Sequence, residues 1–117
     1  MSEIVIATKI VDETPLTISF IQTDGYATAI ANGFSFENIP TQAMMMVTEI
    51  AEFVNELNFE SPLVKKEYRD LRYAEELGDV IIRTCSLAQS MNLDLTAAIN
   101  QKLTTNKKRP YRHGKLF

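Results

Sequence analysis

The sequence has few of the residues that disulfides, zinc sites and membrane anchors require. Its 117 residues include one cysteine, Cys85, and one histidine, His113, so no intrachain disulfide can form and a thiolate or paired-histidine zinc site lacks ligands. No apolar run approaches the roughly 20 residues of a membrane helix, and no basic stretch leading into an apolar one opens the chain. We therefore expect a soluble, cytoplasmic protein with no membrane anchor and no secretory signal.

Motifs for covalent catalysis are missing as well. The four glycines are scattered, so there is no phosphate-binding glycine loop, and no Gly-x-Ser-x-Gly motif is present. Cys85 falls among apolar residues at helical spacing, which is more typical of a small core side chain than of a nucleophile. The sequence therefore gives little support to nucleophilic catalysis.

Helical periodicity is the strongest pattern that the sequence does contain. Apolar residues make up 45% of the chain and charged residues 23%, which is ordinary for one globular domain, here residues 1–117. Residues 3–11 are β-branched and apolar, so residues 1–15 suit a short strand or an extended arm. The remainder predicts an all-α, four-helix-bundle-like domain.

Capping and helix-breaking residues predict where these helices end. The first helix is expected to open at Thr14-Pro15 and run toward Ala31, the second to start near Thr41, the third to end near Ser90, and the fourth to span Asp94 to about Thr105. Ser61 is a candidate cap for a turn that leads into the third helix. Apolar residues recur at helical spacing on the second helix at Met44, Val47, Ile50, Ala51, Val54 and Leu57. The expected core stripe of the third helix is Leu77, Val80, Ile81, Thr84, Leu87 and Ala88.

A run of three methionines, Met44 to Met46, makes the second helix more apolar than one helix stripe can bury. A four-helix domain of this size often leaves an apolar face uncovered. We therefore expect the chain to form a homodimer, or a dimer of dimers, through such faces.

Four carboxylates occur in two pairs within these apolar stretches, Glu49 and Glu52 on the second helix and Glu76 and Asp79 on the third. A spacing of three residues places both members of a pair on one helix face, about 5–6 Å apart at Cβ. If the two faces pack together, four anions converge and require a cation. Because the ligands are all oxygens, Mg²⁺ is the expected ion, and Mn²⁺ can substitute.

A solvated acidic helix face is the alternative interpretation of these pairs. Two features count against it. No lysine lies four residues after Glu49, Glu52 or Asp79 to pair with the acid. Gly78 sits inside the third helix, where glycine costs about 1 kcal/mol relative to alanine, so close approach of another helix or a ligand would explain it.

The C-terminal segment, residues 102–117, is strongly basic. No acid follows Asp94, and six of the twelve basic residues lie here: Lys102, Lys107, Lys108, Arg109, Arg112 and Lys115. The segment is either a solvated terminus or an anion site facing the carboxylates, an arrangement that suits a metal-bound polyphosphate. Because the rest of the chain is acidic, a nucleic-acid-binding surface is not expected.

Taken in order, these motifs resemble those of the MazG-like all-α nucleoside triphosphate pyrophosphohydrolases, in their small single-domain branch. The resemblance rests on Glu-x-x-Glu at Glu49/Glu52, on Glu-x-x-Asp at Glu76/Asp79, and on the ending Lys-x-x-x-Asn-x-x-Arg-Pro-Tyr-x-His-Gly over residues 102–114. It covers about residues 27–115. Thr48 stands where the family often has a further glutamate.

The resemblance implies a Mg²⁺-dependent enzyme that hydrolyses a (deoxy)nucleoside triphosphate to the monophosphate and pyrophosphate, with a role in clearing the nucleotide pool. The implied metal-binding and catalytic residues are Glu49, Glu52, Glu76 and Asp79. The implied substrate-binding residues are Lys102, Asn106, Arg109 and Arg83. Arg83 could instead be a partner of the acids, because it lies four residues after Asp79 on the same helix face.

A non-catalytic helical binding module is the competing interpretation. Such a homodimer would engage a protein or a nucleic acid through the methionine-rich face and the basic segment. Mg²⁺-dependent release of pyrophosphate from a panel of nucleotides would separate the two interpretations. A di-iron bundle fits less well, because that site requires Glu-x-x-His pairs.

Overall fold

The computed structural model describes residues 15–58 and 62–116, and this part of the chain contains four α-helices and no β-strand. The elements are α2 (Ile18–Ala31), α3 (Ile39–Asn58), α4 (Lys66–Ser90), α5 (Leu95–Lys107) and the short 3-10 helix η1 (Tyr111–Gly114). The all-α prediction is confirmed for these residues. The expected strand or arm at residues 3–11 and the candidate cap Ser61 lie outside them. None of the described helices is long and apolar enough to cross a membrane.

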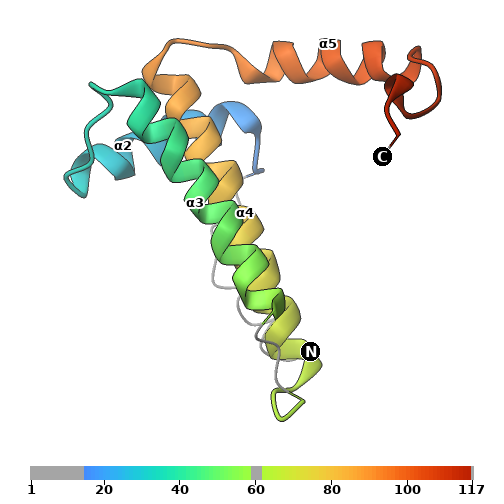
Figure 1. The fold of residues 1–117 in the computed structure, drawn as a ribbon. Helices are drawn as coiled ribbons and strands as arrows, with labels where there is room; N and C mark the ends of the chain where they lie inside the picture. The colour runs from blue at the N-terminus through green and yellow to red at the C-terminus, as the bar shows by residue number, and fades with distance from the viewer. Residues whose placement is uncertain (1–14, 59–61, 117) are drawn as a thin grey trace.

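Figure 1 shows α3 and α4 side by side, α2 across their upper part, and α5 leading away from the other three helices. The expected bundle therefore reduces, within one chain, to an α3–α4 hairpin with α2 packed against it. A fourth helix is present at the expected place in the sequence but does not pack alongside the other three.

α2 begins later than the sequence suggested. Its cap is Thr17, whose Oγ1 accepts a hydrogen bond from Phe20 N at 3.0 Å. The predicted start at Pro15 is wrong, because the threonine next to the helix supplies the side-chain acceptor that an N-terminus requires. The predicted end is confirmed, with Asn32 as the C-terminal cap and Gly33 at φ 91°.

The other predicted helix ends agree more closely with the structure. α3 includes Pro40 in its first turn, so it begins slightly before the predicted Thr41, and Asn38 Oδ1 accepts from Thr41 N at 3.1 Å. The predicted cap of α5 is confirmed, because Asp94 Oδ1 accepts from Ala97 N at 3.1 Å.

α3 and α4 are antiparallel and meet along the acidic stripe of α3. Phe53 packs edge to face on Tyr73, with ring centroids 5.9 Å apart. Nearby, Arg72 Nε donates to Glu56 Oε2 at 3.0 Å. The glutamates of α3 therefore face the neighbouring helix, and the apolar stripe of α3 faces outward.

α2 crosses α4 at Gly25, which is buried. A Cβ atom at Gly25 would lie 2.8 Å from Ser86 Oγ and 3.5 Å from Ile82 Cγ2. Gly25 is thus the position that permits the close crossing of the two helices.

Few apolar side chains are fully buried in a single chain. Within residues 15–58 and 62–116, only Cys85 and Ala88 are, which confirms Cys85 as a core residue. The expected core positions Leu77 and Ile81 are 48% and 51% exposed, so that part of the predicted α4 stripe is wrong for the isolated chain. The large apolar side chains of α3 that remain exposed are Met44, Val47, Ile50, Val54 and Leu57. Packing against one neighbour covers only one side of each helix, and the remaining apolar faces have no cover within the described residues.

Candidate active site

Three of the four predicted acids converge between α3 and α4. Carboxylate oxygens of Glu49, Glu76 and Asp79 all lie within 4.8 Å of one another. The acidic face of α3 thus meets the acidic face of α4 where the two helices pack side by side. Oxygen atoms at this separation from two helices can surround a small divalent cation.

Glu52, the fourth acid, is exposed and flanks this triad. Its pKa is raised, mainly by the negative charge of Glu49, with smaller contributions from burial, from a hydrogen bond to Glu49 and from the charge of Glu76. The neighbouring carboxylates therefore repel one another, which makes Glu52 harder to ionise than an isolated glutamate. A divalent cation would relieve the same repulsion.

Glu49 has a cationic partner on α4. Arg83 Nε donates to Glu49 Oε1 at 2.6 Å, and the guanidinium also lies over the Phe34 ring, 5.7 Å from its centroid. Arg83 was expected either to contact the substrate or to pair with the acids, and in the structure it pairs with Glu49. Contact with substrate stays a prediction.

Glu76 has an unsatisfied oxygen. Its Oε2 is buried and has no hydrogen-bond partner in the described part of the chain. A buried carboxylate oxygen without a donor is costly, and a bound cation would satisfy it.

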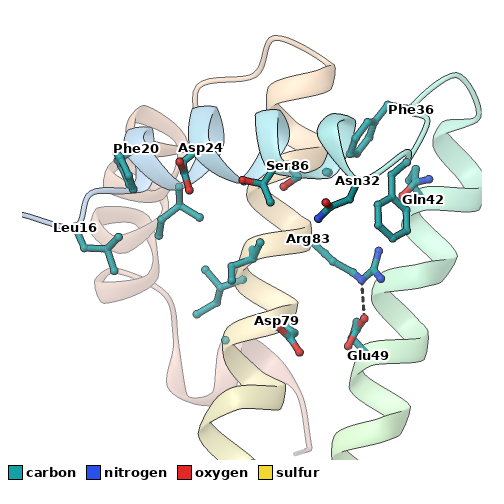
Figure 2. Close-up of a pocket in the computed structure, with 18 residues that line it drawn as sticks. Leu16, Phe20, Asp24, Asn32, Phe36, Gln42, Glu49, Asp79, Arg83 and Ser86 are labelled. Carbon is teal, nitrogen blue, oxygen red and sulfur yellow. Dashed lines mark hydrogen bonds and ion pairs between the residues drawn. The ribbon is translucent and has the colours of Figure 1, made fainter. Parts of the chain in front are cut away.

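A cavity of about 700 Å³ opens beside the acids and extends between α2, α3 and α4. Figure 2 shows Glu49 and Asp79 at one end of it, with Phe36 and Asn32 above them and Leu16 and Phe20 at the far side. Its volume falls in the range of small-molecule and cofactor sites, about 300–1,000 Å³.

Aromatic side chains form part of the cavity wall. Phe20, Phe34 and Phe36 line the cavity. Tyr26 does not; its ring packs against Phe36 with centroids 5.2 Å apart. Gly78 also lines the cavity, and a Cβ there would meet nothing within 4 Å. Of the two explanations for Gly78, close approach of a helix within this chain is therefore wrong, and approach of a ligand stays a prediction.

Polar cavity residues outside the acidic motifs were not predicted as site residues. Asp24, Asn32 and Gln42 all line the cavity. Gln42 Nε2 donates to Ser35 O at 2.7 Å, which ties the start of α3 to the loop before it. These residues belong to three separate segments, so only the packing of α2 on α4 and α3 brings them together.

The basic segment does not reach the acids of its own chain. Lys102 and Asn106 are exposed on α5, which runs away from α3 and α4 (Figure 1). Arg109 follows the end of that helix. The expectation that this face opposes the carboxylates is therefore wrong within one chain. The side chain of His113 lies outside what the structure describes.

No protein-family model, curated protein or solved structure matches this chain.

Proposed function

We propose that this protein is a Mg²⁺-dependent nucleoside triphosphate pyrophosphohydrolase that converts a (deoxy)nucleoside triphosphate to the monophosphate and pyrophosphate. The observation that carries the proposal is that the acidic triad and the cavity are continuous with each other. Glu49 and Asp79 belong both to the acidic triad and to the wall of the 700 Å³ cavity. A metal site for phosphates thus borders an apolar space in which Phe34 and Phe36 offer aromatic surfaces to a base.

The residues present fit a hard divalent cation. The triad supplies only oxygen ligands, Glu76 Oε2 is buried without a partner in the described residues, and Glu52 has a raised pKa caused chiefly by Glu49. Glu49, Glu76 and Asp79 would hold the ion, with Glu52 beside them. When bound, Mg²⁺ neutralises phosphate charge and acidifies the attacking water.

The side chains of this chain then have distinct tasks. Water attacks the α-phosphorus, the bond from that phosphorus to the oxygen bridging toward the β-phosphorus breaks, and pyrophosphate leaves. Glu49 or Glu52 accepts the proton of the water. Arg83 holds Glu49 in place by the 2.6 Å hydrogen bond, and the cavity positions the nucleoside.

Release of pyrophosphate from ordinary and modified (deoxy)nucleoside triphosphates, with Mg²⁺ and with EDTA, tests the proposal. Asp79→Asn keeps the shape of the side chain but removes a metal charge. It should lower turnover by about 100-fold or more, since even supporting residues of metal sites contribute 10–100-fold. Glu56→Gln is the matched control, because Glu56 lies on the same stripe but pairs with Arg72. Equal Mg²⁺-dependent activity in wild type and Asp79→Asn would contradict the metal assignment.

A non-catalytic binding module is the second candidate, favoured by one observation. α3 presents Met44, Val47 and Ile50 in a continuous exposed stripe, 62%, 54% and 49% accessible. Stripes of this kind mark association surfaces. No nucleotide turnover, together with a mutation-sensitive partner interaction at this stripe, would favour the second candidate.

A further inference from the structure

α2 contributes a stripe of polar side chains to the wall of the cavity. Asp24, Thr28 and Asn32 recur at intervals of four residues, and all three line it. At 1.5 Å per residue, Asp24 and Asn32 stand about 12 Å apart along the helix. Figure 2 shows Asn32 toward the acidic triad and Asp24 beside Phe20, at the side away from the triad. The stripe therefore runs from the metal end of the cavity to its far end.

Two polar groups in this part of the cavity make no contact that the fold uses. Within residues 15–58 and 62–116, the Asp24 carboxylate has no hydrogen bond and no ion pair. Ser86 of α4 is only 4% exposed and lines the same cavity, and its hydroxyl makes no hydrogen bond within those residues either. Gly25 leaves room for this hydroxyl, because a Cβ there would lie 2.8 Å from Ser86 Oγ. A buried hydroxyl without a partner is costly, so a ligand that bonds to it would be favoured.

The charge of Asp24 orients a nucleotide in the cavity. A carboxylate at the far end repels phosphates, whereas it accepts hydrogen bonds from the N–H groups of a base. The phosphates therefore lie at the acidic triad with the cation, and the base extends past Phe34 toward Asp24 and Phe20. A purine reaches farther than a pyrimidine, because its Watson–Crick edge belongs to the ring that is more distant from the sugar. The position of Asp24 thus favours a purine.

We infer that the substrate is a guanine nucleotide and that Asp24 selects the base, an inference that rests on the function proposed above. A carboxylate only accepts hydrogen bonds. Guanine presents two adjacent donors, N1–H and the 2-amino group, one for each carboxylate oxygen, and its O6 beside them accepts from the Ser86 hydroxyl. Adenine and cytosine place a ring acceptor next to their amino group, and thymine and uracil place a carbonyl on each side of their N–H. Each of these bases would turn an acceptor toward Asp24, and a site built to form hydrogen bonds discriminates against such mismatches.

Isothermal titration calorimetry with non-hydrolysable α,β-imido deoxynucleoside triphosphates and Mg²⁺ tests the base preference without turnover. The guanine and hypoxanthine analogues differ only in the 2-amino group that donates to Asp24. We expect the guanine analogue to bind about 10–100-fold more tightly than the hypoxanthine analogue, the range for losing one hydrogen bond to a charged group. The thymine analogue should bind more weakly than both, because it turns a carbonyl toward the carboxylate. Equal affinities of the wild type for the guanine and hypoxanthine analogues would overturn the inference.

The same titrations with Asp24→Asn identify the residue that reads the base. The amide keeps the shape of the side chain but has one acceptor oxygen in place of two, so the preference for guanine over hypoxanthine should be lost. Asp70→Asn is the matched control, because Asp70 pairs with Lys66 on α4 and does not line the cavity. This control should keep the preference of the wild type. A preference that survives in Asp24→Asn would overturn the role of Asp24.

Pyrophosphate release from deoxyguanosine and deoxyinosine triphosphates separates this inference from the proposed function. Release from both at equal kcat/KM would overturn the guanine assignment and leave the pyrophosphohydrolase standing. Guanine-selective binding without release from any nucleotide would refute the hydrolysis and keep the base assignment. Failure of every analogue to bind would overturn both.

Discussion

Arg83 on α4 and Glu49 on α3 form the most enclosed of the ion pairs identified in the described residues, with side chains 26% and 12% exposed. The pair joins the two antiparallel helices beside the acidic triad. Glu49 therefore makes two kinds of contact, one to a fixed guanidinium and one to the carboxylates with which it would share a cation. Arg83 both offsets the charge of Glu49 and orients it.

Replacing this arginine should destabilise the fold. Arg83→Ala leaves the largely buried Glu49 without its partner, and we expect the free energy of unfolding to fall by about 1.5–3 kcal/mol, the range for hydrogen bonds to charged groups. Arg72→Ala is the matched control. The Arg72–Glu56 pair is 58% and 28% exposed, so solvent screens it and its loss should cost much less than the loss of Arg83. Urea denaturation measures the free energy of unfolding of both variants. Equal losses of stability would show that the burial of Glu49 does not strengthen its ion pair.

Mg²⁺ should change the pH dependence of stability at the acidic cluster. Without metal, the folded pKa of Glu52 lies above its unfolded value, mainly because of Glu49, so the folded state holds more protons than the unfolded chain. Stability is then lost as the pH rises through the folded pKa of Glu52. Mg²⁺ should raise Tm more at about pH 7.5 than at about pH 5, because protons compete for the same oxygens.

The variant Glu52→Gln separates this effect from other titrations. This variant should make the free energy of unfolding less dependent on pH at pH values above the ordinary pKa of glutamate. Glu56 contributes the opposite slope at lower pH, because its hydrogen bond to Arg72 lowers its pKa. Thermal scans with EDTA and with Mg²⁺ measure both effects. A Mg²⁺ shift in Tm that does not change with pH would contradict competition at this cluster.

Two glycines should respond oppositely to alanine. Gly78→Ala adds a Cβ into open space within a helix and should raise the free energy of unfolding by about 0.5–1 kcal/mol. Gly25→Ala places a Cβ 2.8 Å from Ser86 Oγ and should destabilise by about 1–3 kcal/mol. Ser86→Ala in the Gly25→Ala background removes the clashing oxygen and should recover part of the loss.

Gly78→Ala also tests why a glycine occupies that position. Because Gly78 lines the cavity, the more stable variant should have a higher KM for nucleotide. Steady-state kinetics beside thermal melts check this trade-off. A variant that is more stable and has an unchanged KM would show that the ligand does not approach Gly78.

The exposed stripe of α3 should hold copies of the chain together. Ile50 is 49% exposed at the middle of that stripe, and Ile50→Glu should shift the mass by light scattering from at least a dimer toward a monomer. Thr23→Glu, at an exposed position of α2, should leave the mass unchanged. A monomeric wild type with full activity would show that one chain forms a complete site.

Much of the local structure could be predicted from the sequence because it depends on contacts a few residues apart. The cap at Asp94, the stop at Asn32-Gly33 and the helical periodicity of α3 and α4 are all local signals, and the described residues agree with them. The spacing of Glu49 and Glu52, and of Glu76 and Asp79, likewise places each pair on one face. The sequence determined these features by short-range hydrogen bonding and helix geometry.

The tertiary structure decided which faces meet. Periodicity alone does not distinguish an apolar stripe that packs within the chain from one that stays exposed, so the exposure of Leu77 and Ile81 was not predictable. The same holds for Gly25, whose use depends on Ser86 of another helix, and for Gln22, which fixes the direction of α5 through Leu93 and Leu95. Local sequence set each helix and its acidic face; contacts between residues far apart in the chain brought three acids together and directed the basic segment away from them.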